Sequence, residues 1–213
     1  MHLQKKGLRV LGIADSYSGR EHSILAGIVM RRDLVIDGTA FSQVTVGGMD
    51  ATEGVLTLIR ALDRRDINAI FLSGCVIAFF NIIDPRRVQE CTGLPVICVS
   101  YEESFGLEGD IRHHFPGDTK RRDAYRSLGE RIPHTHPNGQ MVFIRSWGIG
   151  FCEAAQLCSA FTSEGKIPEP LRVARISARA VHEFTRRADT GTGGDAADSL
   201  ASSGEFISGK DDK

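Results

Sequence analysis

Apolar residues in the first quarter of the chain fall into short, β-branched runs of the kind that form strands. Three such runs cover residues 8–14, 23–30 and 34–46, with short polar links between them. Short links of this kind favour antiparallel pairing of consecutive strands. Gly47 and Gly48 then break the pattern. The sequence therefore predicts a three-stranded antiparallel meander at the start of the fold.

A helix is predicted directly after this break. Asp50 is a typical N-cap residue, and Glu53 stands three residues later, in the capping-box position. Val55, Ile59 and Leu62 then form one apolar stripe at helical spacing. We expect this helix to end near residue 65.

The middle of the chain alternates between buried strands and helices. Residues 67–72 and 94–99 are almost entirely apolar, as expected for strands covered on both faces. Between them, Asp84 and Pro85 mark a helix start, and Gly93 marks its end. Further along, the pattern predicts a strand and three helices, at residues 141–145 and at 119–130, 151–162 and 171–187.

A meander followed by α/β alternation is typical of the ribonuclease H-like fold. The predicted fold class is therefore α/β, with a mixed β-sheet and flanking helices. In that fold the first and fourth strands lie side by side and parallel, so that their carboxyl ends form a crevice that binds ligands. We expect the residues just after Ile13 and Leu72 to face each other there.

Charge is unevenly distributed along the 213 residues. Residues 1–188 carry 24 basic and 21 acidic side chains, whereas residues 189–213 carry six acidic and two basic ones. A mildly basic body permits binding of DNA or RNA. The composition predicts one domain over residues 1–188 and a disordered acidic tail over residues 189–213. No run is long or apolar enough for a membrane helix or a signal peptide, and we expect a cytoplasmic protein.

Cysteine and histidine give no strong signal for a metal site. The five cysteines lie mostly in apolar runs without a CxxC pair, so we interpret them as buried thiols of a reducing compartment. The histidines cluster at positions 113–114 and 134–136. No acid or thiol is suitably spaced to complete a transition-metal site with them.

Four segments resemble an archaeal family, once called domain of unknown function 99 and now endonuclease dU-like. They are RVLGIAD at residues 9–15, VTVGGMDAT at 44–52, GLPVI at 93–97 and IPEPLRVA at 167–174. The order and spacing agree over roughly residues 7–180. The family is similar to endonuclease V. The resemblance implies a ribonuclease H-like core and magnesium-dependent cleavage of nucleic acid in active members.

Several positions depart from the family pattern of acidic residues. Family members carry paired aspartates after the first strand and an Asp-Gly after the fourth, where this chain has Ala14 before Asp15, and Ser73. Glu102 follows the fifth strand where basic residues are usual, and Phe79 replaces a family glycine. Paired-metal hydrolysis needs several carboxylates converging on ions about 3.5–4 Å apart. The two lost acids therefore bear directly on activity.

The resemblance leaves Asp15 and Asp50 as candidate catalytic residues and magnesium ligands. Asp15 also fits a polar strand terminus, and Asp50 fits a helix N-cap. Because adjacent strand residues point to opposite faces, Asp15 cannot replace an acid at position 14 unless the strand has already turned. Asp37, beside Gly38, is interpreted as a turn or bulge residue.

The last predicted helix carries a basic stripe. Arg172, Arg175 and Arg179 recur at helical spacing and form a candidate nucleic-acid-binding surface. The alternative is a solvated face opposite a core face, which we assign to four apolar residues: Val173, Ile176, Ala180 and Phe184.

Two hypotheses remain. The first is a magnesium-dependent nuclease of the endonuclease dU-like type that acts on deaminated bases, with activity impaired by Ala14 and Ser73. The second is a catalytically inactive member of the same fold that binds nucleic acid or another protein.

Overall fold

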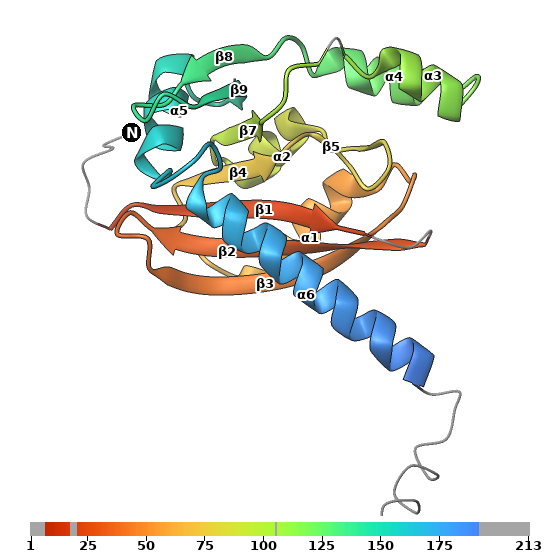
Figure 1. Cartoon of the computed structure of the whole chain (residues 1–213), viewed down its shortest axis with the longest axis horizontal. Coiled ribbons are helices and arrows are strands. Elements are labelled where there is room, and N and C mark those ends of the chain that lie inside the picture. Colours follow the sequence, from red (N-terminus) through yellow and green to blue (C-terminus); the bar gives the residue numbers. More distant parts are fainter. Residues whose placement is uncertain (1–6, 18–20, 105, 192–213) are drawn as a thin grey trace, which may run out of the picture. The chain divides into compact units, whose positions relative to one another are not determined.

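A seven-stranded mixed sheet forms the centre of the computed structural model, which describes residues 7–17, 21–104 and 106–191. Its strand order is β3-β2-β1-β4-β7-β9-β8 (Figure 1). The meander consists of β1 (Arg9–Ser16), β2 (His22–Arg31) and β3 (Ile36–Thr45), and both pairings are antiparallel, as predicted. Asp37 is the extra residue of a bulge opposite Val29 and Met30, which confirms its interpretation.

The parallel part of the sheet lies where the pattern placed it. β1 runs parallel to β4 (Ala69–Ser73), and β4 runs parallel to β7 (Val96–Ser100). Ile13 pairs with Leu72 in this register, so the residues after them do share one edge of the sheet. β9 (Met141–Trp147) returns antiparallel to β7. The sequence pattern did not predict the short edge strand β8 (Ile132–Thr135).

The helices and one small hairpin complete the fold. The hairpin pairs β5 (Val76–Ile77) with β6 (Asn81–Ile82) and, like the helix over Glu108–His114, has no counterpart in the sequence prediction. The helices are α1 (Ala51–Leu62), α2 (Pro85–Thr92), α3 (Glu108–His114), α4 (Thr119–Ser127), α5 (Phe151–Ala160) and α6 (Glu169–Gly191). As predicted, Asp84 caps α2, since its side chain accepts hydrogen bonds from two backbone amides of the first turn.

Two separate cores lie on the two faces of the sheet. On one face, Leu11 and Ile13 of β1 pack with α1 and α2. On the other face, Val10 and Ala14 pack with α5 and with the first turns of α6. This alternation is the ordinary period of a strand. It fixes the direction of each side chain at the carboxyl end of β1.

A close backbone contact sets the rotation of α6. A Cβ atom at Gly12 of β1 would lie 2.5 Å from the carbonyl carbon of Pro170, so only glycine permits this approach. The small side chains of Ala174 and Ala178 are then fully buried, whereas Ile176 is 58 % exposed. Of the predicted core face, Val173 does pack against the core, but the prediction is wrong for Ile176, Ala180 and Phe184, which are exposed, because close packing on the sheet selects the alanines at 174 and 178.

The chain divides into two compact units, residues 1–182 and residues 183–213. Within the second unit, the described part is the end of α6, which extends to Gly191. The predicted acidic tail lies outside the described residues from position 192 onward. The single domain over residues 1–188 and the disordered tail thus stay predictions.

No helix among the described residues has the length and apolarity needed to cross a membrane. The cysteines are free thiols, and three of them are buried as predicted. Cys91 and Cys152 are exposed, so the prediction is wrong for these two. Both lie on the solvent side of amphipathic helices, α2 and α5.

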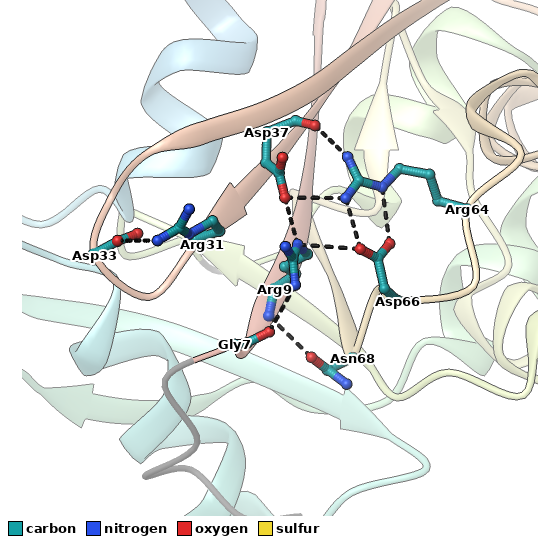
Figure 2. Close-up of polar contacts among 8 residues, drawn as sticks. All are labelled: Gly7, Arg9, Arg31, Asp33, Asp37, Arg64, Asp66 and Asn68. Atoms are coloured by element: carbon teal, nitrogen blue, oxygen red, sulfur yellow. Dashed lines mark hydrogen bonds and ion pairs between the residues drawn. The ribbon is translucent and has the colours of Figure 1, made fainter.

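An ion-pair network closes the sheet where β1 and β4 begin (Figure 2). Arg64 donates to Asp66 at 2.7 and 2.8 Å and to the Asp37 carboxylate at 3.0 Å. Arg9 hydrogen-bonds Asp37 and lies 3.2 Å from Asp66. Hydrogen bonds from Arg64 are the main reason that the pKa of Asp66 falls to about 2. Opposite charges are thus matched within the network.

Candidate nucleic-acid interface

Asp15 lies at the opposite end of β1, where the parallel strands finish. One of its carboxylate oxygens, Oδ2, accepts hydrogen bonds from the backbone amide of Ala78 at 3.1 Å and from Ser23 Oγ at 3.2 Å. Burial raises the pKa of this carboxyl, and the two hydrogen bonds and the charge of Arg175 only partly oppose that effect. A buried carboxylate whose net pKa is raised destabilises the fold when it ionises. This perturbation makes Asp15 a functional-site candidate.

A strained turn holds Asp15 from one side. Ala78, Phe79 and Phe80 have φ values of 40°, 58° and 61°, a left-handed conformation that side chains with a Cβ disfavour. The turn is fixed by its neighbours, because Ala78 donates to Asp15 and its carbonyl accepts from the Gly47 amide at 2.8 Å. Glycine, which the family resemblance implies at this position, adopts a positive φ without that cost. Strain of this kind gathers at functional sites.

Asp50 serves a different purpose from the one that the capping box implies. Both of its oxygens are taken, by the amide and hydroxyl of Thr45 and by Asn81 Nδ2 at 2.6 Å. Asn81 Oδ1 accepts from the Ala51 amide at 3.0 Å and so caps α1 in place of Asp50. Glu53 pairs instead with Arg87 and with another arginine of α1. The capping-box prediction is wrong because Asn81, 30 residues from Ala51 in sequence, fills the cap.

The hydrogen bonds to Asp50 also set its ionisation. Burial works against the charged form, but the donors Asn81 and Thr45 outweigh it and lower the pKa of Asp50. Asp50 is therefore an anion whose lone pairs are engaged by protein donors. Asp15 and Asp50 are linked only indirectly, through the two ends of the segment from Ala78 to Asn81.

The two positions where the family resemblance implies acids lie on the α6 side of the sheet. Ala14 packs in the core shared with α5 and α6. Ser73 continues the β4 alternation of Ala69 and Phe71, which belong to the same core. Asp15 follows Ala14 near the end of β1. By strand alternation its side chain starts from the other face of the sheet, the face of Leu11 and Ile13. An acid at position 15 therefore does not replace one at position 14.

The family implies magnesium, and the described residues do not fit a paired-metal centre. No group of three or more His, Cys, Asp or Glu side chains in this part of the chain is placed to hold a metal ion. Asp15 is half-buried and one of its oxygens is engaged, and both oxygens of Asp50 are engaged by protein donors. Magnesium needs several free hard-oxygen ligands. We therefore assign no chemical step to a metal at this site, and the ligand roles of both aspartates stay a prediction.

Arg175 and Arg179 of α6 lie beside Asp15. Together with Ser16, Tyr17 and Ile176, these three residues line a groove of about 390 Å³, here called the Asp15 groove. Arg175 is exposed and makes no hydrogen bond or ion pair with any described residue. Arg172, the third predicted member of the stripe, pairs instead with Glu169 and does not line the groove. The structure thus brings two of the three predicted arginines to the candidate site.

Four basic residues meet in a second cavity at the same edge of the sheet. It measures about 410 Å³, borders Ser73 and Tyr101, and is here called the basic cavity. Its basic residues are Arg131, Arg145, Lys166 and Arg175. Of these, only Arg175 belongs to the predicted nucleic-acid-binding stripe of the last helix. Arg145 could have been recognised from the sequence, because it is the one charged residue in the largely apolar strand β9.

The histidine clusters form local contacts. His134 Nε2 and His136 Nδ1 both hydrogen-bond Ser159 Oγ, at 2.8 and 2.9 Å. Burial lowers the pKa of each ring and so favours the neutral form. His114 instead packs against the rings of Phe79 and Phe80.

The sheet order and flanking helices, with parallel β1, β4 and β7 meeting at a polar edge, define a ribonuclease H-like α/β protein. The chain belongs to the endonuclease dU family, whose family model matches residues 6–182. A curated relative, a UPF0215 protein of Pyrobaculum calidifontis, is 38 % identical over 182 residues, which cover 83 % of this chain and 98 % of the relative.

Two solved structures show the same architecture. A protein of unknown function from Archaeoglobus fulgidus matches with a TM-score of 0.71 and 27 % identity, over 82 % of this chain and 98 % of that one. Endonuclease V of Ciona intestinalis, in complex with a 24mer DNA containing an inosine followed by a ribo-adenosine, matches with a TM-score of 0.57 and 15 % identity, over 84 % and 87 %. The second likeness is one of fold.

Proposed function

We propose that this protein binds nucleic acid at the carboxyl edge of its parallel strands and holds the phosphate backbone with Arg175 and Arg179. The observation that carries the proposal is the exposed Arg175 side chain, which makes no hydrogen bond or ion pair with a described residue and lines both the Asp15 groove and the basic cavity. Arginine binds phosphate through paired N–H groups, and such contacts supply most of the sequence-independent affinity.

Support for this surface comes from the helix geometry. Arg175 and Arg179 are four residues apart on α6 and therefore share one face. The groove that they line opens beside Asp15, at the edge where the parallel strands of the mixed sheet end, which is the usual ligand-binding edge of an open α/β sheet. Endonuclease V, which shares the fold, has been solved with inosine-containing DNA. Nucleic acid is therefore the partner to which we assign the groove.

Family membership favours a second function, magnesium-dependent cleavage of strands that contain deaminated bases, with Asp15 and Asp50 as the carboxylates. Binding without cleavage is the better match to the site, since Ala14 and Ser73 stand where the family resemblance implies acids, and both oxygens of Asp50 are engaged. In a protein that binds without cleaving, Arg175 and Arg179 contact phosphate directly, with no metal ion between them.

The test is fluorescence anisotropy and gel electrophoresis on the same samples. Labelled DNA and RNA, undamaged or containing uracil or hypoxanthine, are mixed with the full chain, with and without Mg²⁺. We expect salt-dependent binding that Arg179→Gln weakens several-fold, with intact strands throughout. No binding at low salt by the wild-type protein would refute the proposal. Mg²⁺-dependent cleavage that Asp15→Asn and Asp50→Asn abolish would establish the nuclease instead.

A further inference from the structure

The basic cavity has a charge that its own residues do not neutralise. Arg131, Arg145, Lys166 and Arg175 line it, and Glu102 is the one carboxylate among its lining residues. Glu102 pairs with Lys166 at 2.6 Å, but its side chain is 83 % exposed and so is largely screened by water. The cavity therefore carries a formal excess of three positive charges.

Carbonyl groups, which carry no net charge, hold these cations in place. Arg131 donates to the carbonyls of residues 102 and 104 at 3.0 and 2.9 Å. Lys166 donates to the Tyr101 carbonyl at 3.0 Å, and Arg145 Nε donates to the Gly129 carbonyl at 2.9 Å. The terminal nitrogens of Arg145 make no hydrogen bond to a described residue. The side chains are thus positioned, while their charge stays available to a ligand.

Neutral groups complete the lining. The Tyr101 hydroxyl is buried without a hydrogen bond to any described residue, and burial is the main cause of its raised pKa. Burial likewise raises the pKa of the Cys75 thiol. Both groups therefore stay protonated at neutral pH and add no negative charge to the cavity. Ser73 contributes another hydroxyl beside Tyr101.

We propose that the basic cavity binds a terminal phosphate group, a phosphomonoester or free phosphate carrying two negative charges. Three excess cationic charges match a dianion better than the single charge of a backbone diester. Planar guanidinium groups and buried hydroxyls are suitable donors for phosphate oxygens. The volume of about 410 Å³ accommodates a phosphate with its attached sugar.

The phosphate can come from a strand end or from a small molecule. Arg175 lines both the basic cavity and the Asp15 groove, so a strand whose end lies in the cavity can continue along the groove. That source rests on the proposed function. Binding of a free mononucleotide or of inorganic phosphate does not depend on the proposed function. The same cationic and hydroxyl groups of the cavity would bind the phosphate in either case.

Isothermal titration calorimetry on the full chain tests the proposal, in a phosphate-free buffer of low ionic strength. The probes are inorganic phosphate, a deoxynucleoside monophosphate, and one oligonucleotide prepared with a 5′-phosphate, a 3′-phosphate or hydroxyl ends. Arg145→Gln removes a cavity charge, Arg145→Lys restores it, and Lys166→Gln is a second removal that keeps an amide donor. Arg65→Gln, at an exposed site beyond α1, is the charge-matched control.

We expect wild-type protein to bind at least one phosphate probe, and Arg145→Gln or Lys166→Gln to weaken that binding about tenfold. Arg145→Lys should recover most of the loss, and Arg65→Gln should change little. A strand end is identified if the phosphorylated oligonucleotide binds more tightly than both its hydroxyl form and the free probes. Equal binding of all phosphate probes identifies a small ligand. Thermal melts verify that each variant is folded.

Two results would overturn the proposal: no binding of any phosphate probe beyond the hydroxyl oligonucleotide, or equal effects of Arg145→Gln and Arg65→Gln. The proposed function is tested by a separate result. Arg179 lines the groove but not the cavity, so Arg179→Gln should weaken all oligonucleotides and leave inorganic phosphate unchanged. Oligonucleotide binding without any phosphate preference refutes the cavity alone.

Discussion

The two ends of β1 use charge in opposite ways. At its amino end, two arginines and two aspartates neutralise one another within hydrogen-bonding distance (Figure 2). At its carboxyl end, Asp15 is half-buried with a raised pKa, and Arg175 makes no hydrogen bond or ion pair with a described residue. Paired charges stabilise a fold, whereas unmatched charges are available to a ligand. The comparison therefore separates a structural end of the sheet from a binding end.

The largest expected effect is on binding, through Arg175. Arg175→Gln should weaken nucleic-acid affinity about tenfold and reduce the slope of log affinity against log salt by about one, since one phosphate contact is lost. Its thermal midpoint should stay close to wild type, because Arg175 has no described hydrogen bond to lose. Anisotropy titrations at several salt concentrations and a thermal melt measure both. A large fall in the midpoint with unchanged affinity would reverse the roles of the two ends.

Arg64→Gln is the matched change at the amino end. It removes the guanidinium that holds Asp37 and Asp66, so two carboxylates then face a single remaining partner, Arg9. We expect the thermal midpoint to fall by roughly 3 °C and nucleic-acid affinity to stay within about twofold of wild type. High salt should shrink the stability difference, because the network is partly exposed. A difference that salt does not change would argue against an electrostatic origin.

Acid should affect the two ends with opposite signs. Asp66 has a lowered pKa of about 2, so its contribution is present above 3.8 and is lost as the pH falls toward 2. Asp15 has a raised pKa, so its ionisation destabilises the fold, and that penalty disappears as the pH falls through the folded pKa to 3.8.

Denaturant titrations of Asp66→Asn and Asp15→Asn from neutral to acidic pH check this contrast. At pH 7, Asp66→Asn should be less stable than wild type, and Asp15→Asn should be equally or more stable, since asparagine can still accept from Ala78 and Ser23. Both differences should diminish in acid. A stability loss in Asp15→Asn that persists at every pH would show that packing, rather than charge, governs that end.

The smallest effects concern the start of α1. Glu53→Ala should change the free energy of unfolding by less than about 0.5 kcal/mol, because its ion pairs with arginines are exposed. Asp50→Ala should lower it by about 1 kcal/mol, since the buried Asn81 amide loses one of its two acceptors and keeps only the Thr45 carbonyl. Chemical denaturation measures both. Equal losses in the two variants would restore the capping-box interpretation.

Local patterning by itself determined the framework of this protein. The β-branched runs, the short links and the cap at Asp84 and Pro85 predict the meander and α2, because each depends on neighbours within a few residues. The all-apolar runs predict the parallel strands β4 and β7, since strands covered on both faces have no polar side. Asp15 could be placed at a strand end because it is the first charged residue after the apolar run of β1.

Tertiary structure decided the rest, and above all the site. The close contact of Gly12 with Pro170 sets the rotation of α6 and so aims Arg175 at the sheet edge. Asn81 takes the cap of α1 from Asp50, a contact that no local pattern encodes. The basic cavity collects its four basic side chains from β9, α6 and two loops, and the first and last of them, Arg131 and Arg175, are 44 positions apart in sequence. Sequence spacing carries no record of such proximity, because packing of the helices and loops on the sheet produces it.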